Sequence, residues 1–257
     1  MRNKTALVTG AASGIGLAIG DALARLNYTV WISDSQFESA ERAALNLREQ
    51  GFDVHAVKLD VSSQTDIDNV VATLEAAGGY ADVLINNAGI QHVAKLEDFP
   101  VDRWRLLTEI LLIGPAMLSR ALLPMMRRHN FGRIINIGSI HSLVASPHKS
   151  AYVAAKHGLL GFSKVVALET AEQNITINTI CPSYVKTPLV EQQIASQAKV
   201  HGISEEEVVN KIMLEPMPKK SFIEMDELSG AVNYLISDAA RNMTGQELVL
   251  DGGWTIK

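Results

Sequence analysis

One glycine-rich turn constrains this chain more than any other feature. The segment Thr9-Gly-Ala-Ala-Ser-Gly-Ile-Gly16 separates a short apolar run, 6–8, from an amphipathic stretch. This order predicts a strand, a tight turn and a helix whose N-terminus can bind a phosphate. Gly10 would permit the turn, Gly14 would let backbone amides approach a pyrophosphate, and Gly16 would allow close packing of helix on strand. Three glycines alone are weak evidence, but this context is typical of a dinucleotide site.

Apolar runs and helical patterns go on alternating along the whole chain. Continuous apolar strands between amphipathic helices indicate a parallel sheet that is covered on both faces. We therefore expect an α/β fold with a doubly wound parallel sheet of Rossmann type, in a single domain spanning 1–257. The expected strands are 6–8, 29–33, 53–59, 83–85, 133–137, 175–180 and 247–250, and the expected helices are 15–26, 38–50, 64–77, 101–128 and 151–173.

The least regular part of the sequence is 188–220. It contains two charged helical patches, 191–200 and 204–214, and ends in Pro216-Met-Pro-Lys-Lys220. An insertion this long between a strand and a helix is usually a lid or a binding loop. We therefore expect a substrate lid within the single domain.

Composition narrows the classes of function. The 257 residues carry a formal net charge of −5, which argues against a nucleic-acid surface. The single cysteine, Cys181, excludes an internal disulfide framework, and the seven His show no paired metal-ligand spacing, so we expect no metal. No apolar run reaches about 18 residues, and the N-terminal apolar segment is too short for a signal peptide. The sequence therefore predicts a cytoplasmic protein without membrane contact.

An acidic residue at the end of the second expected strand bears on the choice of cofactor. Asp34 lies roughly 20 residues beyond the glycine turn, where a carboxylate can bind the adenosine ribose diol. Its charge would repel a 2′-phosphate, and no Lys or Arg lies between Arg25 and Arg42. We therefore expect NAD rather than NADP, unless Asp34 is only a surface turn residue.

The glycine turn and several further motifs resemble the short-chain dehydrogenase/reductase family over essentially the whole chain. The motifs are Thr-Gly-x-x-x-Gly-x-Gly at 9–16, Asp60-Val61, Asn86-Asn-Ala-Gly89, Ser139, Tyr152-x-x-x-Lys156 and Pro182…Thr187. The resemblance implies that Asp60 and Val61 contact adenine. It also implies that Asn87 and Gly89 border the cofactor and that Thr187 lies near the nicotinamide end. The full set of expected cofactor residues is Gly10, Ser13, Gly14, Ile15, Gly16, Asp34, Asp60, Val61, Asn87, Gly89, Tyr152, Lys156, Pro182, Val185 and Thr187.

Tyr152 and Lys156 stand four residues apart, on one face of an expected helix. A free tyrosine has a pKa near ~10 and is a poor base. An ammonium at ~5 Å, with an effective dielectric of ~20, stabilises the phenolate by about 3 kcal/mol, which lowers the pKa by roughly two units. Tyr152 would then act as general base on an alcohol and as acid in reverse. Ser139 would orient the substrate oxygen, and Lys156 would also hold the nicotinamide ribose.

One position departs from the family pattern. Many members carry an Asn in the long central helix, where the helix bends and a backbone carbonyl binds a relay water. By its spacing from Trp104 and Gly114, this chain has Leu111 there. Pro115 has no N–H, so the Leu111 carbonyl should lack its helical partner and remain able to bind the water. Otherwise the relay is damaged and the enzyme slower, or the kink is purely structural.

Several segments resemble the members of the family that oxidise D-3-hydroxybutyrate. They are 86–91, 138–152, 187–193 and Asp251-Gly-Gly-Trp254. One cation and several neutral donors suit a carboxylate with a short apolar chain. Taken singly, Lys149 and His141 are as readily explained as solvated surface residues. The substrate residues that the resemblance implies are Gln91, Ser139, His141, Lys149, Tyr152, Gln193 and, nearby, Trp254.

The expected activity is therefore NAD-dependent, reversible oxidation of D-3-hydroxybutyrate to acetoacetate. Tyr184 and Ser183 stand where that group often has Trp and Gly, so a longer 3-hydroxy acid could be the substrate instead. The chain could also act on a sugar or steroid alcohol or on an acyl-carrier thioester, or it could serve as a non-catalytic nucleotide-binding regulator. The Ser139–Tyr152–Lys156 set argues against the regulator. The resemblance also implies a homotetramer, with the long helices and the C-terminal end at its interfaces.

Overall fold

A seven-stranded parallel sheet forms the centre of the structure, a computed structural model that describes residues 3–256. The strand order β3-β2-β1-β4-β5-β6-β7 changes direction between β1 and β4, which confirms the expected doubly wound sheet. The expected domain, 1–257, extends beyond the described residues by two positions at one end and one at the other. The strands are β1 (Thr5–Thr9), β2 (Thr29–Asp34), β3 (Val54–Lys58), β4 (Val83–Asn86), β5 (Gly132–Ile137), β6 (Ile175–Pro182) and β7 (Glu247–Leu250).

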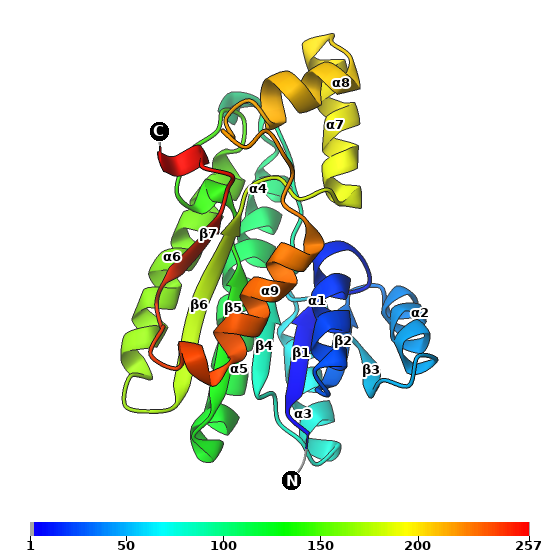
Figure 1. Ribbon diagram of the computed structural model, residues 1–257, viewed down its shortest axis with the longest axis vertical. Helices are drawn as coiled ribbons and strands as arrows, with labels where there is room; N and C mark the ends of the chain where they lie inside the picture. The colour runs from blue at the N-terminus through cyan, green and yellow to red at the C-terminus, as the bar shows by residue number, and fades with distance from the viewer. Residues whose placement is uncertain (1–2, 257) are drawn as a thin grey trace.

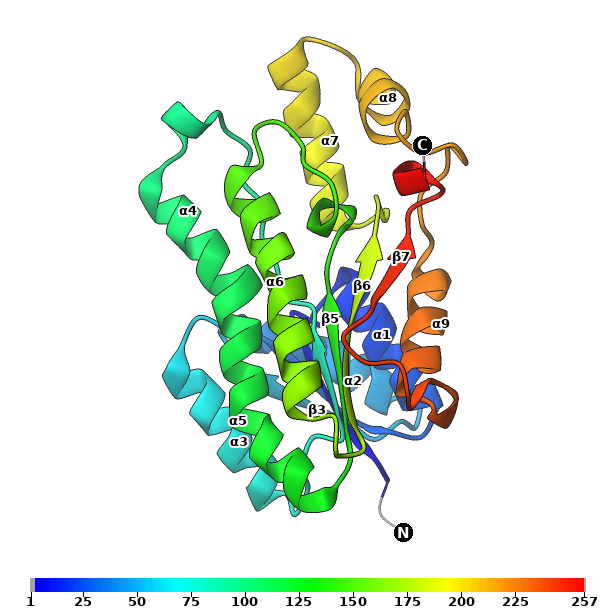
Figure 2. The same ribbon diagram turned by 90° about the vertical axis from the view of Figure 1, so that its left-hand side faces the viewer.

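Helices cover both faces of the sheet, which is why β1, β4, β5 and β6 are buried at every position. One face packs against α1 (Gly14–Arg25), α2 (Phe37–Arg48) and α9 (Met225–Ile236). The other packs against α3 (Gln64–Ala76), α5 (Gly114–His129) and α6 (Ser150–Glu169). Figures 1 and 2 show the two layers of helices on either side of the strands.

Helix α9 was not predicted from the sequence. Its buried residues Leu228, Ala231, Val232 and Leu235 nevertheless follow the spacing of a helix with one apolar face. They pack on the sheet beside α1, so the helix completes one of the two layers. The remaining predicted helices and strands are present with ends shifted by at most four residues, which is the usual uncertainty of element boundaries.

The expected long central helix is one continuous helical segment with a change of winding inside it. It consists of α4 (Val101–Thr108), a π-helical turn (Glu109–Ile113) and α5. By length and composition alone, this segment is apolar enough to cross a membrane. Its buried residues Leu118, Leu122 and Met126 pack against the sheet, as those of a core helix do.

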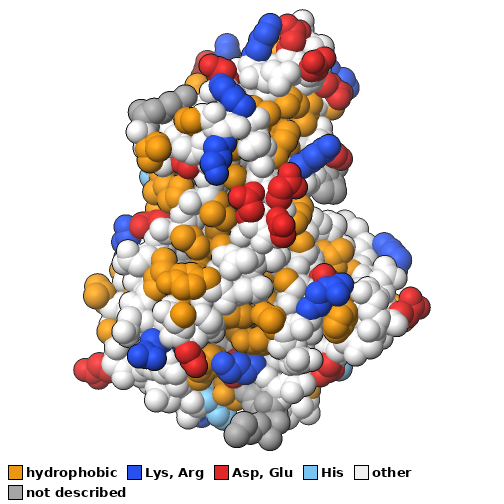
Figure 3. All heavy atoms as spheres, in the orientation of Figure 1, with side chains coloured by type: hydrophobic (Ala, Val, Ile, Leu, Met, Phe, Trp, Pro, Cys, Tyr) orange, Lys and Arg blue, Asp and Glu red, His pale blue; other side chains and the backbone are white. Residues whose placement is uncertain are grey.

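The segment predicted as a lid rises above the carboxyl ends of the strands. It contains α7 (Pro188–His201), α8 (Glu205–Val208) and a π-helical turn (Val209–Met213), which confirms that the two charged patches are helical. Figures 1 and 2 show α7 and α8 at the top of the molecule, and Figure 3 shows them as a lobe on which acidic and basic side chains are mixed. A bridge between Val185 and Ile223 joins the two roots of the segment.

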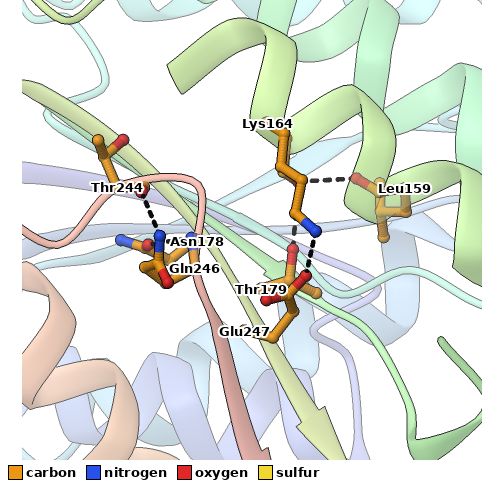
Figure 4. Close-up of polar contacts among 8 residues, drawn as sticks. Leu159, Lys164, Asn178, Thr179, Thr244, Gln246 and Glu247 are labelled. Carbon is orange, nitrogen blue, oxygen red and sulfur yellow. Dashed lines mark hydrogen bonds and ion pairs between the residues drawn. The ribbon is translucent and has the colours of Figure 1, made fainter. Parts of the chain in front are cut away.

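Strand β7 anchors the C-terminal end against β6 and α6. The Asn178 side-chain oxygen accepts a hydrogen bond from the Gln246 amide at 3.1 Å, and the Lys164 ammonium pairs with the Glu247 carboxylate at 2.7 Å. Figure 4 shows Lys164 reaching from α6 to Glu247. Beyond β7, the Asp251 carboxylate accepts hydrogen bonds from the backbone of Gly253 and Thr255. These contacts hold the last residues at the same end of the sheet as the lid.

Candidate active site

A single cleft brings the predicted cofactor and substrate residues together. It encloses about 380 Å³ at the carboxyl ends of the strands, where the strand order changes direction. Parallel α/β sheets bind their ligands at this position. Every predicted cofactor and substrate residue lines the cleft except Gly16 and Trp254, and Leu111 lines it as well.

The glycine turn is tight because two of its glycines leave no room for a side chain. Gly10 has φ +59°, and a Cβ there would stand 2.8 Å from Cα of Ala88. A Cβ on Gly16 would stand 2.5 Å from the Asn87 side-chain nitrogen, so Gly16 packs beneath the turn rather than facing the cleft. The first turn of α1 therefore presents its free backbone amides to the cleft, which is the arrangement that binds phosphate.

The turn is held in place by hydrogen bonds between the ends of β1 and β4. The Asn87 side chain donates to the backbone carbonyls of Thr9 and Gly10, at 2.9 and 3.0 Å. In return, the Thr9 hydroxyl accepts from the amides of Asn87 and Ala88, both at 3.0 Å. No separate role was predicted for Thr9 from the sequence, although its place directly before the turn was a signal for one.

Of the acidic residues predicted at the adenosine end, Asp34 is the last residue of β2 and Asp60 lies on the loop after β3. Asp34 accepts hydrogen bonds from the backbone amides of Gln36 at 3.1 Å and Ala12 at 3.4 Å. Asp60 accepts from the amide and the hydroxyl of Ser62. These bonds fix the orientation of both carboxylates at the edge of the cleft.

Ser139 sits where β5 ends and a 3₁₀ turn begins. Its hydroxyl accepts from the amide of His141 at 3.1 Å, while the hydroxyl of Ser142 accepts from the amide of Ser139 at 3.2 Å. This reciprocal cap fixes the backbone of the turn that carries Ser139 and His141 at the cleft.

Tyr152 and Lys156 project from one face of α6 into the cleft, as their spacing predicted. The Lys156 ammonium donates to the Ile137 carbonyl at 2.6 Å and lies 5.7 Å from the centre of the Tyr152 ring. Burial raises the pKa of Tyr152, and a hydrogen bond with Ser139 opposes this only in part. The expected lowered pKa of Tyr152 is therefore not found in the chain by itself. Burial also lowers the pKa of Lys156 to about 8, which weakens its pull on the phenol.

Lys149 is a buried cation whose recorded polar neighbours are neutral side chains. It is 5% exposed, and its ammonium lies 3.2 Å from the His141 Nε2 atom and 3.4 Å from the Tyr184 hydroxyl. Among the described residues no carboxylate pairs with it, and burial lowers its pKa to about 8. Burial and the neighbouring ammonium lower the pKa of His141 to about 4, so the imidazole is neutral.

Trp254 stands behind this cluster rather than in the cleft. Its ring stacks on Tyr184 with centroids 6.1 Å apart and meets His141 edge to face at 5.9 Å. It therefore supports two cleft residues instead of lining the cleft itself. Tyr184, which the sequence marked only as a change in pocket size, does line the cleft and contacts Lys149 directly.

The π-helical turn places Leu111 beside the cleft. Gly114 donates its amide to the Glu109 carbonyl, five residues back, and Pro115 follows without an N–H to offer the Leu111 carbonyl. The expected local departure from α-helix is thus a π turn. The Leu111 side chain is 1% exposed and packs against Phe99, in an apolar cluster rather than a polar one.

The arrangement can bind a dinucleotide along the strand ends and an anion beside an acid–base pair. Of the side chains that the structure describes, a Cβ at Gly14 would come within 4.0 Å of Thr187 alone, so space remains between the turn and the start of α7. Tyr152 offers a group that exchanges a proton. Lys149 offers a positive charge against His141, whose ring meets that of Tyr152 edge to face. Within residues 3–256 no cluster of three or more His, Cys, Asp and Glu side chains is placed to hold a metal.

Comparison with known proteins gives a consistent result. The short chain dehydrogenase family matches residues 4–198. Two relatives, the D-beta-hydroxybutyrate dehydrogenases of Rhizobium meliloti (strain 1021) and Cupriavidus necator, are each 44% identical to this chain; the matches cover 98% and 99% of it and 98% of each relative. A gluconate 5-dehydrogenase from Burkholderia cenocepacia J2315, solved with NADP and tartrate, superposes with a TM-score of 0.90 at 31% identity, covering 100% of this chain and 97% of that enzyme.

Proposed function

The chain belongs to the short-chain dehydrogenase family of oxidoreductases, and on that premise we propose that it oxidises D-3-hydroxybutyrate to acetoacetate with NAD, reversibly. The observation that carries the proposal is the buried Lys149 ammonium. It lies against His141, whose ring centre is 6.3 Å from that of Tyr152. A 3-hydroxy acid carries its charge two carbons from the carbon that reacts, so one small substrate reaches both groups.

Tyr152 is the proposed general base. When bound, the nicotinamide supplies the hydride acceptor for the C3 hydrogen of the alcohol. Tyr152 takes the hydroxyl proton as the C–O double bond forms, and it returns a proton in the reverse reaction. Ser139 orients the reacting oxygen by a hydrogen bond, and Lys156 holds the nicotinamide ribose.

The protonation state of Tyr152 sets the balance between the two directions. Burial favours the neutral phenol, which suits the acid needed for reduction. The hydrogen bond from Ser139, the ammonium of Lys156 and the positive charge of an oxidised nicotinamide all favour the phenolate needed for oxidation. The proposed tyrosine therefore acts as a base only with the oxidised cofactor beside it.

Asp34 supports NAD as the cofactor. Its carboxylate is fixed at the cleft by two backbone amides, with lone pairs left for the two ribose hydroxyls of adenosine. The same charge opposes a 2′-phosphate. The gluconate 5-dehydrogenase with NADP makes NADP the competing candidate for this chain, and a comparison of initial rates with each cofactor separates the two.

Lys149 is the proposed anchor of the substrate carboxylate. A buried ammonium with neutral neighbours forms strong charge-assisted hydrogen bonds to an anion that replaces water. Gln91 and Gln193 line the same cleft and supply neutral donors. Gln193 lies on α7, so the lid helix would bring it to the substrate and exclude water from the hydride transfer.

A homotetramer is also part of the proposal. Helix α6 leaves Leu168 79% exposed and Val165 54% exposed, on the side away from the cleft residues. Apolar side chains grouped in this way are typical of a surface that a partner covers. Light scattering after gel filtration measures the assembly, and a monomeric mass would contradict the tetramer.

Formation of NADH from each enantiomer of 3-hydroxybutyrate tests the proposed function. We expect rapid absorbance growth with the D enantiomer and NAD, and little with the L enantiomer. Tyr152→Phe should lower kcat roughly 10²- to 10⁴-fold while leaving NADH binding measurable by fluorescence. Equal rates with both enantiomers, or no rate with either, would contradict the proposal.

A further inference from the structure

The Tyr184 hydroxyl belongs to the group of atoms that would meet the substrate carboxylate. Tyr184 follows β6, at the root of the lid, and its backbone carbonyl accepts a hydrogen bond from Ile223 at 2.9 Å. Its ring stacks on Trp254 with planes inclined by 28°. Both the backbone and the ring are therefore held, so the hydroxyl has a fixed place in the cleft.

Hydrogen-bond directions around Lys149 fix where the proton of that hydroxyl points. An ammonium can only donate, so the Tyr184 oxygen accepts from Lys149 at 3.4 Å. His141 Nε2 accepts as well, because Nδ1 of the ring faces the Val144 carbonyl at 3.3 Å. Among the described residues, the Tyr184 hydroxyl therefore has a proton to donate and no recorded acceptor. Beside it, the Lys149 ammonium has no recorded carboxylate partner.

The spacing of the two donors matches one oxygen of a carboxylate. The Lys149 nitrogen and the Tyr184 oxygen are 3.4 Å apart. An oxygen at the usual distance of about 2.8 Å from each can sit between them and accept from both. Burial raises the pKa of Tyr184 to about 12, so the hydroxyl keeps its proton at neutral pH.

We propose that Tyr184 is a further specificity-determining residue, which donates its hydroxyl proton to the substrate carboxylate beside Lys149. This inference rests on the proposed carboxylate site and deepens it. A Trp or Phe at this position keeps an aromatic wall but provides no hydroxyl there. The hydroxyl therefore selects for an acid over an ester or amide of the same shape, in addition to the selection by charge.

Tyr184→Phe tests the inference, because it removes one oxygen and keeps the ring that stacks on Trp254. We expect KM for D-3-hydroxybutyrate to rise about tenfold, as for the loss of one hydrogen bond to a charged group, with kcat within about twofold of wild type. KM for the methyl ester should change by less than about twofold. Tyr234→Phe, on the exposed face of α9, is the matched control and should leave both substrates unchanged.

The outcomes separate this inference from the proposed function. Wild-type discrimination between acid and ester, combined with an unchanged acid KM in Tyr184→Phe, would overturn the role of the hydroxyl alone. A wild type that does not discriminate would overturn the carboxylate site first. An equal rise in KM for acid and ester in the variant would mean that Tyr184 acts only by packing, which also overturns the inference.

Discussion

The two ends of the cleft are built by different means. At the nucleotide end, the turn between β1 and α1 is shaped by backbone: Gly10 and Gly16 admit no side chain, and Asn87 and Thr9 bind main-chain atoms. The other end, which we propose binds the substrate acid, is called the acid end below. There, side chains contact one another around Lys149. They come from the turn after β5, the start of α6, the loop after β6 and the C-terminus.

Because of this difference, we expect the two ends to tolerate different amino-acid substitutions. The nucleotide end depends on steric fit in a short local motif, so a single added carbon at Gly16 meets atoms 2.5 Å away. The acid end depends on burial and charge among residues far apart in the chain. We therefore expect that substitution of one side chain there changes which ligand is bound. Substitutions at the two ends should therefore affect the kinetics of cofactor and substrate independently, because within residues 3–256 no recorded hydrogen bond joins the glycine turn to the cluster around Lys149.

A large effect confined to the nucleotide end is expected from Asp34→Ala. Loss of a charge-assisted hydrogen bond to the adenosine ribose costs roughly 1.5–3 kcal/mol. This corresponds to about a 10- to 150-fold lower kcat/KM for NAD. NADP should become relatively more acceptable, and KM for 3-hydroxybutyrate at saturating NAD should stay near wild type.

The matched control is Asp68→Ala, which removes an exposed carboxylate from α3, away from the cleft. It should leave both kinetic constants unchanged. Efficient use of NADP by the wild type would contradict the role of Asp34. A rise in the KM for the acid equal to that for NAD would show that the two ends are not independent.

A smaller effect is expected from pH. In the proposed site the ammonium form of Lys149 would bind the acid, and burial lowers the pKa of Lys149 to about 8. Binding is therefore intact below pH 8 and lost above it, so KM for 3-hydroxybutyrate should rise above pH 8 and approach a tenfold increase per unit. His141, with a pKa of about 4, adds no inflection near neutrality.

The methyl ester isolates this effect from the rest of the site. Burial also lowers the pKa of Lys156 to about 8, but its proposed role is to hold the cofactor, so its titration should affect both substrates alike. When the ratio of the KM values for acid and ester is plotted against pH, it should therefore show one inflection, that of Lys149. A ratio that stays constant from pH 7 to pH 10 would contradict the assignment.

Local patterns in the sequence predicted most of the fold and the nucleotide end. The strand–turn–helix at 9–16 needs only neighbouring residues, and the structure confirms it. The apolar runs of the sheet were equally clear because helices bury both faces. Helix α9 was missed although its apolar spacing is regular and Asp226 and Glu227 lie in its first turn. It follows the irregular segment 188–220, and its N-cap, Glu224, is not one of the residue types that usually mark a helix start.

For the acid end, the sequence predicted which residues take part but not how they are arranged. The resemblance named His141, Lys149 and, nearby, Trp254, but it did not predict that the Trp254 ring stacks on Tyr184. The sign of the pKa shift of Tyr152 was wrong for the chain alone, because pair attraction was counted without the burial that opposes it. Burial and ring stacking arise from segments that meet only in the folded chain, so neighbouring residues could not reveal them.

The carboxylate anchor is tested most directly by the acid-to-ester ratio of kcat/KM in Lys149→Met, which removes the charge and keeps the buried stem. Exposed Lys95→Met is the matched control. We expect kcat/KM for D-3-hydroxybutyrate to fall about 30- to 1,000-fold, as for the loss of roughly 2–4 kcal/mol from a charged partner. The methyl ester should lose no more than about threefold, with NADH binding intact. Wild-type kcat/KM on the acid, or equal losses on acid and ester, would contradict the assignment of Lys149 as the carboxylate anchor.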